Sequence, residues 1–189
     1  MSDFRQTNAA SHAIMSPMAF LEPLAEAQPL WHRVDSPIGE LLLVGDGRSL
    51  TQLHMSPPPD ASPGRQDPDA FADVEGQLTA YFAGELTDFD VPLAPTGTGF
   101  QLRVWSALLD IPYGETASYG EIAMAVGKPE AVRAVGATNG RNPIAVIVPC
   151  HRVIGSDGTL VGYGGGLPRK RLLLELEAEH AAPRLWSSV

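Results

Sequence analysis

The sequence is poor in cysteine, in aromatic residues and in long apolar runs. One of its 189 residues is a cysteine, and aromatic residues make up 7%. A single cysteine cannot form an internal disulfide, and no Cys/His cluster has the spacing of a zinc site. No apolar run approaches the roughly 20 residues that a membrane helix needs. These absences exclude a disulfide scaffold, a cysteine-based metal module and a helical membrane protein.

The first residues also lack the marks of export. Their sequence, MSDFRQTNAASHAIMSP, has neither the charged start nor the apolar stretch of a signal peptide. Hydrophobic residues make up 44% of the chain, which is enough to bury the core of one domain or of two small ones. We therefore expect a globular protein of the reducing cytoplasm.

The chain has fewer positively than negatively charged residues, and they are distributed unevenly along it. Residues 1–99 carry 4 Lys/Arg and 14 Asp/Glu, whereas residues 100–177 carry 8 Lys/Arg and 7 Asp/Glu. The first stretch therefore has a net charge of −10 and the second of +1. The second half can approach phosphates without repelling them, although its affinity for nucleic acid of any sequence should be modest.

The first half predicts a small sheet. Residues 1–29 are rich in Ala, Ser, Met and Pro, and we expect them to form a disordered extension. A strand pattern begins at Trp31 and includes the runs 41–44 and 50–54, which the turn residues Asp46-Gly47 separate. This pattern predicts an antiparallel hairpin or meander.

A helix and a linker complete the first half. Residues 56–69 are too rich in proline for regular structure and predict a loop. Apolar residues at helical spacing predict a helix over 71–82. We therefore expect an N-terminal α/β domain at 30–92, a linker at 93–97 and a second domain at 98–180, followed by a tail at 181–189.

The second domain should be mainly helical, so the fold class is α+β. Two capping boxes, Thr98 to Gln101 and Ser118 to Glu121, each predict the start of a helix. Gly127 ends the second of these helices, and Pro129 opens the next, which continues to Gly140. Two short helices joined in this way have the spacing of a helix-turn-helix. A last helix begins at Pro168.

The segment Val148-Pro149-Cys150-His151 holds the candidate nucleophile. A free thiol is mostly protonated at neutral pH, and a nearby histidine that takes its proton produces the reactive thiolate. An acid of the last helix, Glu175 or Glu177, could orient the histidine as in catalytic triads. Adjacent side chains of an extended segment point to opposite faces, so we expect a bridging water rather than direct contact. The alternative is a buried, inert cysteine.

The second helix of the pair presents small residues and one cation. Small residues on a helix face let the backbone lie close to another surface, and an arginine in the middle of that face could reach into a DNA stack. The helix could equally be an ordinary packed one with a solvated arginine. The residues of this face are Ala131, Arg133, Ala134, Gly136 and Ala137. The glycine loop at 162–167 lacks the context of a phosphate loop and better suits a flexible pocket wall.

Four motifs in order resemble the methylated-DNA–protein-cysteine methyltransferases, which are the O6-alkylguanine-DNA alkyltransferases. The motifs are IPYGETASYGEIA, RAVG followed by Asn142-Pro143, VPCHRVIG, and GYGGGL with RKRLLLELE. The resemblance covers roughly residues 98–177 and implies a C-terminal domain that binds DNA through a helix-turn-helix. It also implies an N-terminal domain with a supporting role.

The resemblance assigns roles to individual residues. Cys150 would accept the alkyl group, His151 would deprotonate it through a water, and Glu177 would hold His151. Asn142 would tie the recognition helix to the active-site segment. Tyr119 would donate a proton to the departing guanine and crowd a backbone phosphate.

The remaining roles concern DNA and the pocket. The resemblance implies binding in the minor groove of double-stranded DNA, with little sequence preference and with the damaged base flipped out. Arg133 would fill the gap in the duplex, with Thr138 among the groove contacts of the small-residue face. Backbone groups at Val153, Tyr163 and Gly164, next to Pro149, would complete the pocket. Thr138 and Ala145 depart from residues that are common in the family.

The implied function is DNA repair by direct reversal of damage. A monomer would transfer the alkyl group of O6-alkylguanine irreversibly to Cys150, once per molecule, without cofactor or metal. The sequence leaves open O4-alkylthymine as a second substrate and weak cooperative self-association on DNA. Two alternatives are a lesion sensor of the alkyltransferase-like type, whose members lack the cysteine, and a Cys-His hydrolase that turns over.

Overall fold

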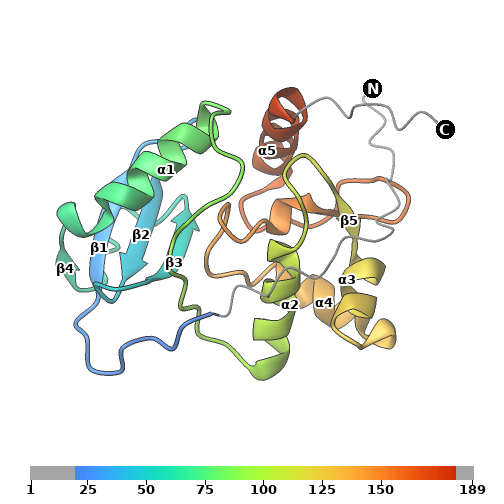
Figure 1. The fold of residues 1–189 in the computed structure, drawn as a ribbon, viewed down its shortest axis with the longest axis horizontal. Coiled ribbons are helices and arrows are strands. Elements are labelled where there is room, and N and C mark those ends of the chain that lie inside the picture. Colours follow the sequence, from blue (N-terminus) through green and yellow to red (C-terminus); the bar gives the residue numbers. More distant parts are fainter. Residues whose placement is uncertain (1–19, 182–189) are drawn as a thin grey trace.

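The computed structural model describes residues 20–181. It consists of two units that lie side by side (Figure 1). The sheet domain contains β1 to β4 and α1, and the helical domain contains α2 to α5. The expected order of an α/β unit followed by a mainly helical unit is confirmed.

The sheet has the order β3-β2-β1-β4. Strands β1 (Leu30–Val34), β2 (Leu41–Gly45) and β3 (Leu50–Met55) form the predicted antiparallel meander. The fourth strand, β4 (Arg65–Gln66), pairs parallel with β1 inside the segment that we expected to be a loop. The sequence could not indicate this strand, because it is two residues long and depends on the backbone of β1 as a partner.

One helix covers this sheet (Figure 1). A 3₁₀ turn, η1 (Asp69–Phe71), leads into α1 (Ala72–Phe82), which confirms the predicted helix. Val74, Leu78 and Tyr81 are its buried residues, and their spacing of four and three places them on one face. The helix therefore delivers Tyr81 to the interior of the molecule, where its exposed fraction is 0%.

The helical domain opens with two capped helices. The capping boxes of α2 (Gly99–Leu109) and α3 (Tyr119–Ala125) are both formed as predicted, with Thr98 and Ser118 as N-caps. Gly127 ends the α3 segment at a φ of 69°, which favours glycine. A 3₁₀ turn, η2 (Pro129–Ala131), then leads into α4 (Val132–Asn139).

Short pairings bring the reactive segment to the middle of the molecule. Strand β5 (Ala117–Ser118) pairs parallel with β6 (Val153–Ile154), directly after the 3₁₀ turn η3 (Cys150–Arg152). A bridge between Leu53 and Ile144 joins β3 to the segment that precedes η3. The last helix, α5 (Leu167–His180), packs against η3. The turn that holds Cys150 therefore packs against α5 and α2, in the segment that follows the bridge to β3.

The expected N-terminal extension is ordered over its described part. Residues 20–29 have no helix or strand, but the Leu21 amide donates to the Leu93 carbonyl over 2.8 Å. The Leu24 amide donates to a carboxylate oxygen of Asp46 over 2.9 Å. These bonds correct the prediction of disorder for residues 20–29, because composition does not report contacts with distant backbone. Residues 1–19 and 182–189 lie outside the described residues, including most of the predicted tail.

Candidate active site

Cys150 is the first residue of η3 and is 4% exposed. The 3₁₀ turn corrects our expectation of an extended segment, and the preceding apolar run 144–148 forms turns rather than a strand. Pro149, with a φ of −83°, begins the turn, and the Arg152 amide donates to its carbonyl over 3.0 Å. In a turn of this kind, both Cys150 and His151 point into the protein interior, and His151 is 0% exposed.

His151 is held by Glu177, which settles the choice between the two glutamates. The distance between His151 Nε2 and Glu177 Oε1 is 2.8 Å, and both side chains are 0% exposed. Glu175, two residues earlier in α5, is exposed. Burial lowers the pKa of His151, so the imidazole is neutral near pH 7. Its Nδ1 is buried and has no hydrogen-bond partner among the described residues. It is therefore able to accept a proton.

The thiol of Cys150 is protonated in the resting protein. Burial raises its pKa, and the side chain of Asn142 and the charge of Lys170 lower it again in part. Because a thiolate is the nucleophile, Cys150 needs a base to become reactive. The neutral imidazole of His151, in the same turn, is the base that the structure offers.

Asn142 braces the segment that precedes the cysteine. Its Nδ2 donates to the Val148 carbonyl over 2.7 Å, and its Oδ1 accepts from the Ile144 amide over 3.0 Å. Between these two contacts, Val146 has a φ of 70°, an unusual value for a β-branched residue. The side chain of Asn142 therefore fixes a strained turn that aims the chain at Cys150.

Asn139 is a site residue that the sequence did not reveal. It is the last residue of α4, is 3% exposed, and donates from Nδ2 to the Cys150 carbonyl over 3.2 Å. This contact joins α4 directly to Cys150. An asparagine at the end of a helix is usually interpreted as a stop signal, and only its burial shows the other use.

Two tyrosines surround the thiol. Tyr119, the first residue of α3, donates from its hydroxyl to the Val161 carbonyl over 3.2 Å. Tyr163 approaches the Met55 sulfur of the sheet domain over 3.6 Å. Burial raises the pKa of both hydroxyls, and the negative charge that Cys150 carries as a thiolate raises it further. Both tyrosines therefore remain proton donors at physiological pH, beside the reactive sulfur.

Lys170 was also missed by the sequence analysis. It is 0% exposed, and its Nζ donates to the carbonyls of Val153 over 2.6 Å and Val161 over 2.9 Å. Burial lowers the pKa of Lys170 to about 8. The ammonium therefore ties the two edges of the 153–161 segment together and places a positive charge near Cys150. The available signal was its position, two helical turns before Glu177.

Glu177 collects more donors than a histidine partner needs. Arg152 donates from Nε to Oε2 over 2.9 Å and from its NH2 group to Oε1 over 3.0 Å. The Gly114 amide donates to Oε2 over 3.1 Å, and the Tyr81 hydroxyl donates to Oε1 over 2.7 Å. Burial alone would raise the pKa of Glu177, but His151 and Arg152 lower it to about 2. The carboxylate therefore stays charged in the interior.

The small-residue face of α4 is mostly accessible. Arg133, Ala134 and Ala137 are exposed, and Ala131 and Gly136 are partly buried. Thr138 is 5% exposed, and its carbonyl accepts from Trp105 Nε1 over 3.1 Å. The expectation of a groove contact at Thr138 is therefore wrong, because helical spacing turns it inward together with Val135.

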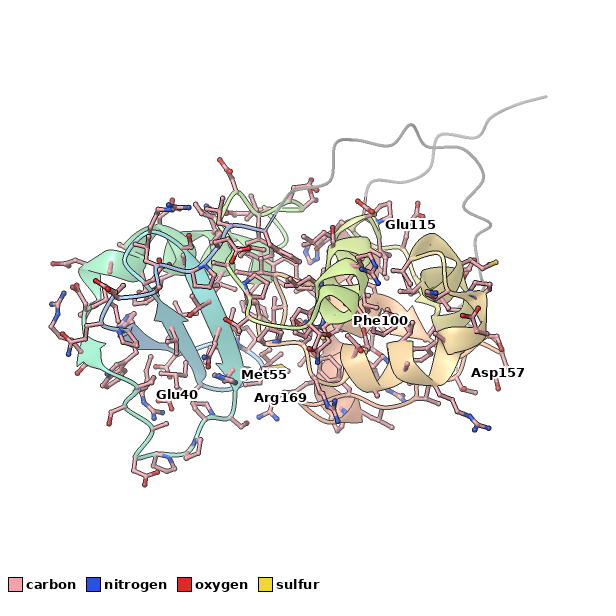
Figure 2. The ribbon with its side chains drawn as sticks, turned by 90° about the horizontal axis from the view of Figure 1, so that it is seen from below. Glu40, Met55, Phe100, Glu115, Asp157 and Arg169 are labelled. Atoms are coloured by element: carbon pink, nitrogen blue, oxygen red, sulfur yellow. The ribbon has the colours of Figure 1, made fainter. Side chains whose placement is uncertain are left out.

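Of the segments that we expected to line the pocket, the glycine loop reaches the sheet domain. Val153 and Pro149 are buried, Tyr163 is partly buried and Gly164 is exposed. A Cβ atom at Gly165 would lie 2.6 Å from the end of the Met55 side chain, so a larger residue would require this methionine to shift. Arg169 donates to the Gly165 carbonyl and, across the boundary, to the Ile38 carbonyl and Ser56 Oγ. Met55 and Arg169 lie close together where the domains meet (Figure 2). Ala145 is 4% exposed.

Within residues 20–181, no group of three or more His, Cys, Asp or Glu side chains is placed to hold a metal ion. No helix in the same range has the length and apolar character to cross a membrane.

Comparison with known families matches most of the chain. Residues 30–95 match the ribonuclease-like domain of 6-O-methylguanine DNA methyltransferase. Residues 99–179 match the DNA binding domain of the same family. The two matches together exceed half of the chain.

Individual relatives agree with this result. A methylated-DNA–protein-cysteine methyltransferase of Mycobacterium tuberculosis is 60% identical over 154 residues, which are 80% of this chain and 93% of the relative. One of Methanosarcina acetivorans is 53% identical over 149 residues, which are 76% and 94% of the two chains. The crystal structure of Mycobacterium tuberculosis OGT in complex with DNA has a TM-score of 0.77 and 60% identity. It covers 80% of this chain and 94% of that chain.

Proposed function

The chain belongs to the 6-O-methylguanine DNA methyltransferase family, and we propose that it repairs DNA by moving the alkyl group of O6-alkylguanine onto Cys150. One observation carries the choice of Cys150. It is the lone cysteine of the chain, and it lies in one turn with a buried, neutral histidine that a charged glutamate holds.

The proposed reaction begins with proton transfer. The Cys150 thiol gives its proton through a bridging water to Nδ1 of His151, and Glu177 stabilises the imidazolium that forms. The charge of Lys170 favours the thiolate. The thiolate then attacks the alkyl carbon in line, so that the S–C bond forms while the bond from carbon to O6 breaks.

Guanine leaves as the other product. Tyr119 lies beside the thiol and would donate a proton toward the departing base, which balances the proton that Cys150 gave up. The carbonyls of Val153 and Val161, held by Lys170, would form the pocket edges with the backbone of Tyr163 and Gly164. A thioether is not reversed by thiol exchange, so each molecule would react once, without a cofactor.

The base must first leave the duplex, because the target atom lies within the stack. The exposed small residues of α4 allow its backbone to enter the minor groove, where Arg133 would replace the flipped nucleotide. A solved relative, Mycobacterium tuberculosis OGT, is described in complex with DNA, which supports DNA as the partner. We also propose that residues 93–97 link the two domains and that the protein acts in the cytoplasm, where a free thiol stays reduced.

The test is the mass of the protein after incubation with duplex DNA that contains one O6-methylguanine. We expect the mass of one methylene group to be gained, and peptide fragmentation should place it on Cys150. Cys150→Ala should gain none. An unmodified wild-type protein that still binds the lesion would instead support a lesion sensor. Product that exceeds one equivalent of protein would support a hydrolase.

A further inference from the structure

One side chain of the sheet domain, Tyr81, forms a hydrogen bond with the carboxylate of Glu177. Tyr81, in the last turn of α1, donates from its hydroxyl to Glu177 Oε1 over 2.7 Å, although 96 positions separate the two residues. The tyrosine is 0% exposed. Its ring meets the ring of Tyr113 edge to face, with the centroids 6.0 Å apart. The hydroxyl is therefore held in place and shielded from water.

The hydroxyl shares its acceptor with the histidine. Glu177 Oε1 accepts from Tyr81, from His151 Nε2 and from Arg152, over 2.7, 2.8 and 3.0 Å. Each donor withdraws negative charge from the carboxylate and lowers its basicity. Glu177 Oε1 orients His151, the general base. The hydroxyl of Tyr81, in the sheet domain, therefore makes this oxygen a weaker base.

We infer that Tyr81 is a positioning residue of the alkyl-transfer site, whose hydroxyl fixes the Glu177 carboxylate and limits how strongly Glu177 draws a proton onto His151. The sheet domain is then part of the active site and not only a support. This inference rests on the proposed function, because it concerns the same proton transfer from Cys150.

The sign of the effect follows from the charges around the imidazole. Glu177 of α5 raises the pKa of His151, whereas Arg152 of η3 and Lys170 of α5 lower it, in addition to burial. Burial, together with the charge of Glu177, raises the pKa of Tyr81, so its hydroxyl stays protonated. Removing the hydroxyl makes Glu177 a stronger base, and the pKa of His151 should rise. The acid limb of the transfer rate, where His151 becomes protonated, should then move to higher pH.

The chain offers a matched control. The Tyr113 hydroxyl belongs to the same aromatic cluster, is buried, and has no hydrogen-bond partner among the described residues. Tyr81→Phe and Tyr113→Phe each remove one buried hydroxyl and keep the ring. The two variants differ in whether the lost hydroxyl donates to Glu177.

The experiment measures single-turnover methyl transfer from duplex O6-methylguanine DNA to the full chain between about pH 5 and 9. We expect Tyr81→Phe to move the midpoint of the acid limb upward by about half a pH unit. Tyr113→Phe should keep the wild-type midpoint. A Tyr81→Phe profile that is lower in rate but has the wild-type midpoint would overturn the inference and leave Tyr81 a packing role. If the wild-type protein takes up no methyl group, the proposed function fails instead.

A second measurement applies if Tyr81→Phe does not fold. Wild-type protein with 13C at the tyrosine ring carbon that carries the hydroxyl can be titrated by NMR. The Tyr81 signal should shift with the same midpoint as the acid limb of transfer, because protonating His151 changes the oxygen that both donors share. A Tyr81 signal that stays constant through that limb would contradict the inference.

Discussion

At the scale of single residues, burial controls the reactive thiol more than charge does. Cys150 is 4% exposed, and burial is the largest influence on its pKa, which it raises. The sequence predicted Cys150 and His151, because they are neighbours in one motif. It did not predict Lys170, although the spacing of Lys170 from Glu177 was a signal, and it could not predict Tyr81, because the contact of Tyr81 with Glu177 joins residues 96 positions apart. The thiol of Cys150 is therefore protonated at rest, and the residues around it must remove its proton before it can react.

Replacing Glu177 tests how much its buried carboxylate contributes to the stability of the fold. Glu177→Gln leaves the guanidinium of Arg152 buried without a counter-charge, and we expect the free energy of unfolding to fall by about 3–5 kcal/mol at pH 7. Glu175→Gln, at an exposed position of the same helix, should change it by less than about 0.5 kcal/mol. Denaturant unfolding measures both, and equal small effects would contradict the role of the carboxylate.

The same two variants test how the stability of the fold changes as the pH falls. The pKa of Glu177 is about 2, below its ordinary value of 4.5. A carboxyl group whose pKa is lowered in the folded state stabilises the fold above its unfolded pKa, and this contribution is lost as the pH falls. The wild-type and Glu175→Gln proteins should therefore lose stability between about pH 4.5 and 2, and Glu177→Gln should lose less over that window.

At the scale of elements, the sequence predicted correctly where a helix begins when the helix has its own N-capping residue. Thr98 and Ser118 cap α2 and α3 as their sequences predict. The strand β4, which needs β1 as a distant partner, was missed, and so was the 3₁₀ turn at Cys150, which a local hydrogen bond from Arg152 to Pro149 closes. Thr138, which the resemblance placed among the groove contacts, lies instead on the inner face of α4. The exposed face of α4 is nevertheless made of the small residues and the arginine that we predicted.

Arg133 is the cation of that face, and its replacement tests how α4 is used. If Arg133 fills the gap that a flipped base leaves, Arg133→Ala should slow transfer from duplex DNA by about tenfold or more, since flipping costs a few kcal/mol. Transfer from single-stranded DNA should change little, because no duplex has to be opened. Arg103→Ala, an exposed arginine of α2, is the control. Equal losses on both substrates would argue against insertion into the duplex.

At the scale of the whole molecule, the active site is shared between two domains. The sheet domain supplies Tyr81 to Glu177 and Met55 to Tyr163, and Arg169 joins the glycine loop to Ile38 and Ser56. Composition and motif order predicted both domains. The contacts between them were beyond prediction, since each involves residues more than 90 positions apart.

Arg169→Ala should loosen this boundary without touching the thiol. We expect faster hydrogen exchange at the amides of the glycine loop, because the Gly165 carbonyl loses its donor. Methyl transfer should slow by a factor of about three to ten, since the loop forms the pocket wall. Arg171→Ala, at an exposed position two residues later in α5, should exchange and react like the wild type. Unchanged loop exchange in Arg169→Ala would show that the boundary does not hold the loop.

The central claim is that Cys150 accepts one alkyl group and is then spent. The most direct test mixes the protein with an excess of duplex O6-methylguanine DNA and follows the amount of restored guanine over time. The account predicts a plateau at one guanine per protein molecule, reached as S-methylcysteine appears at Cys150. Restored guanine that keeps rising beyond one equivalent, or a plateau without a modified Cys150, would contradict it.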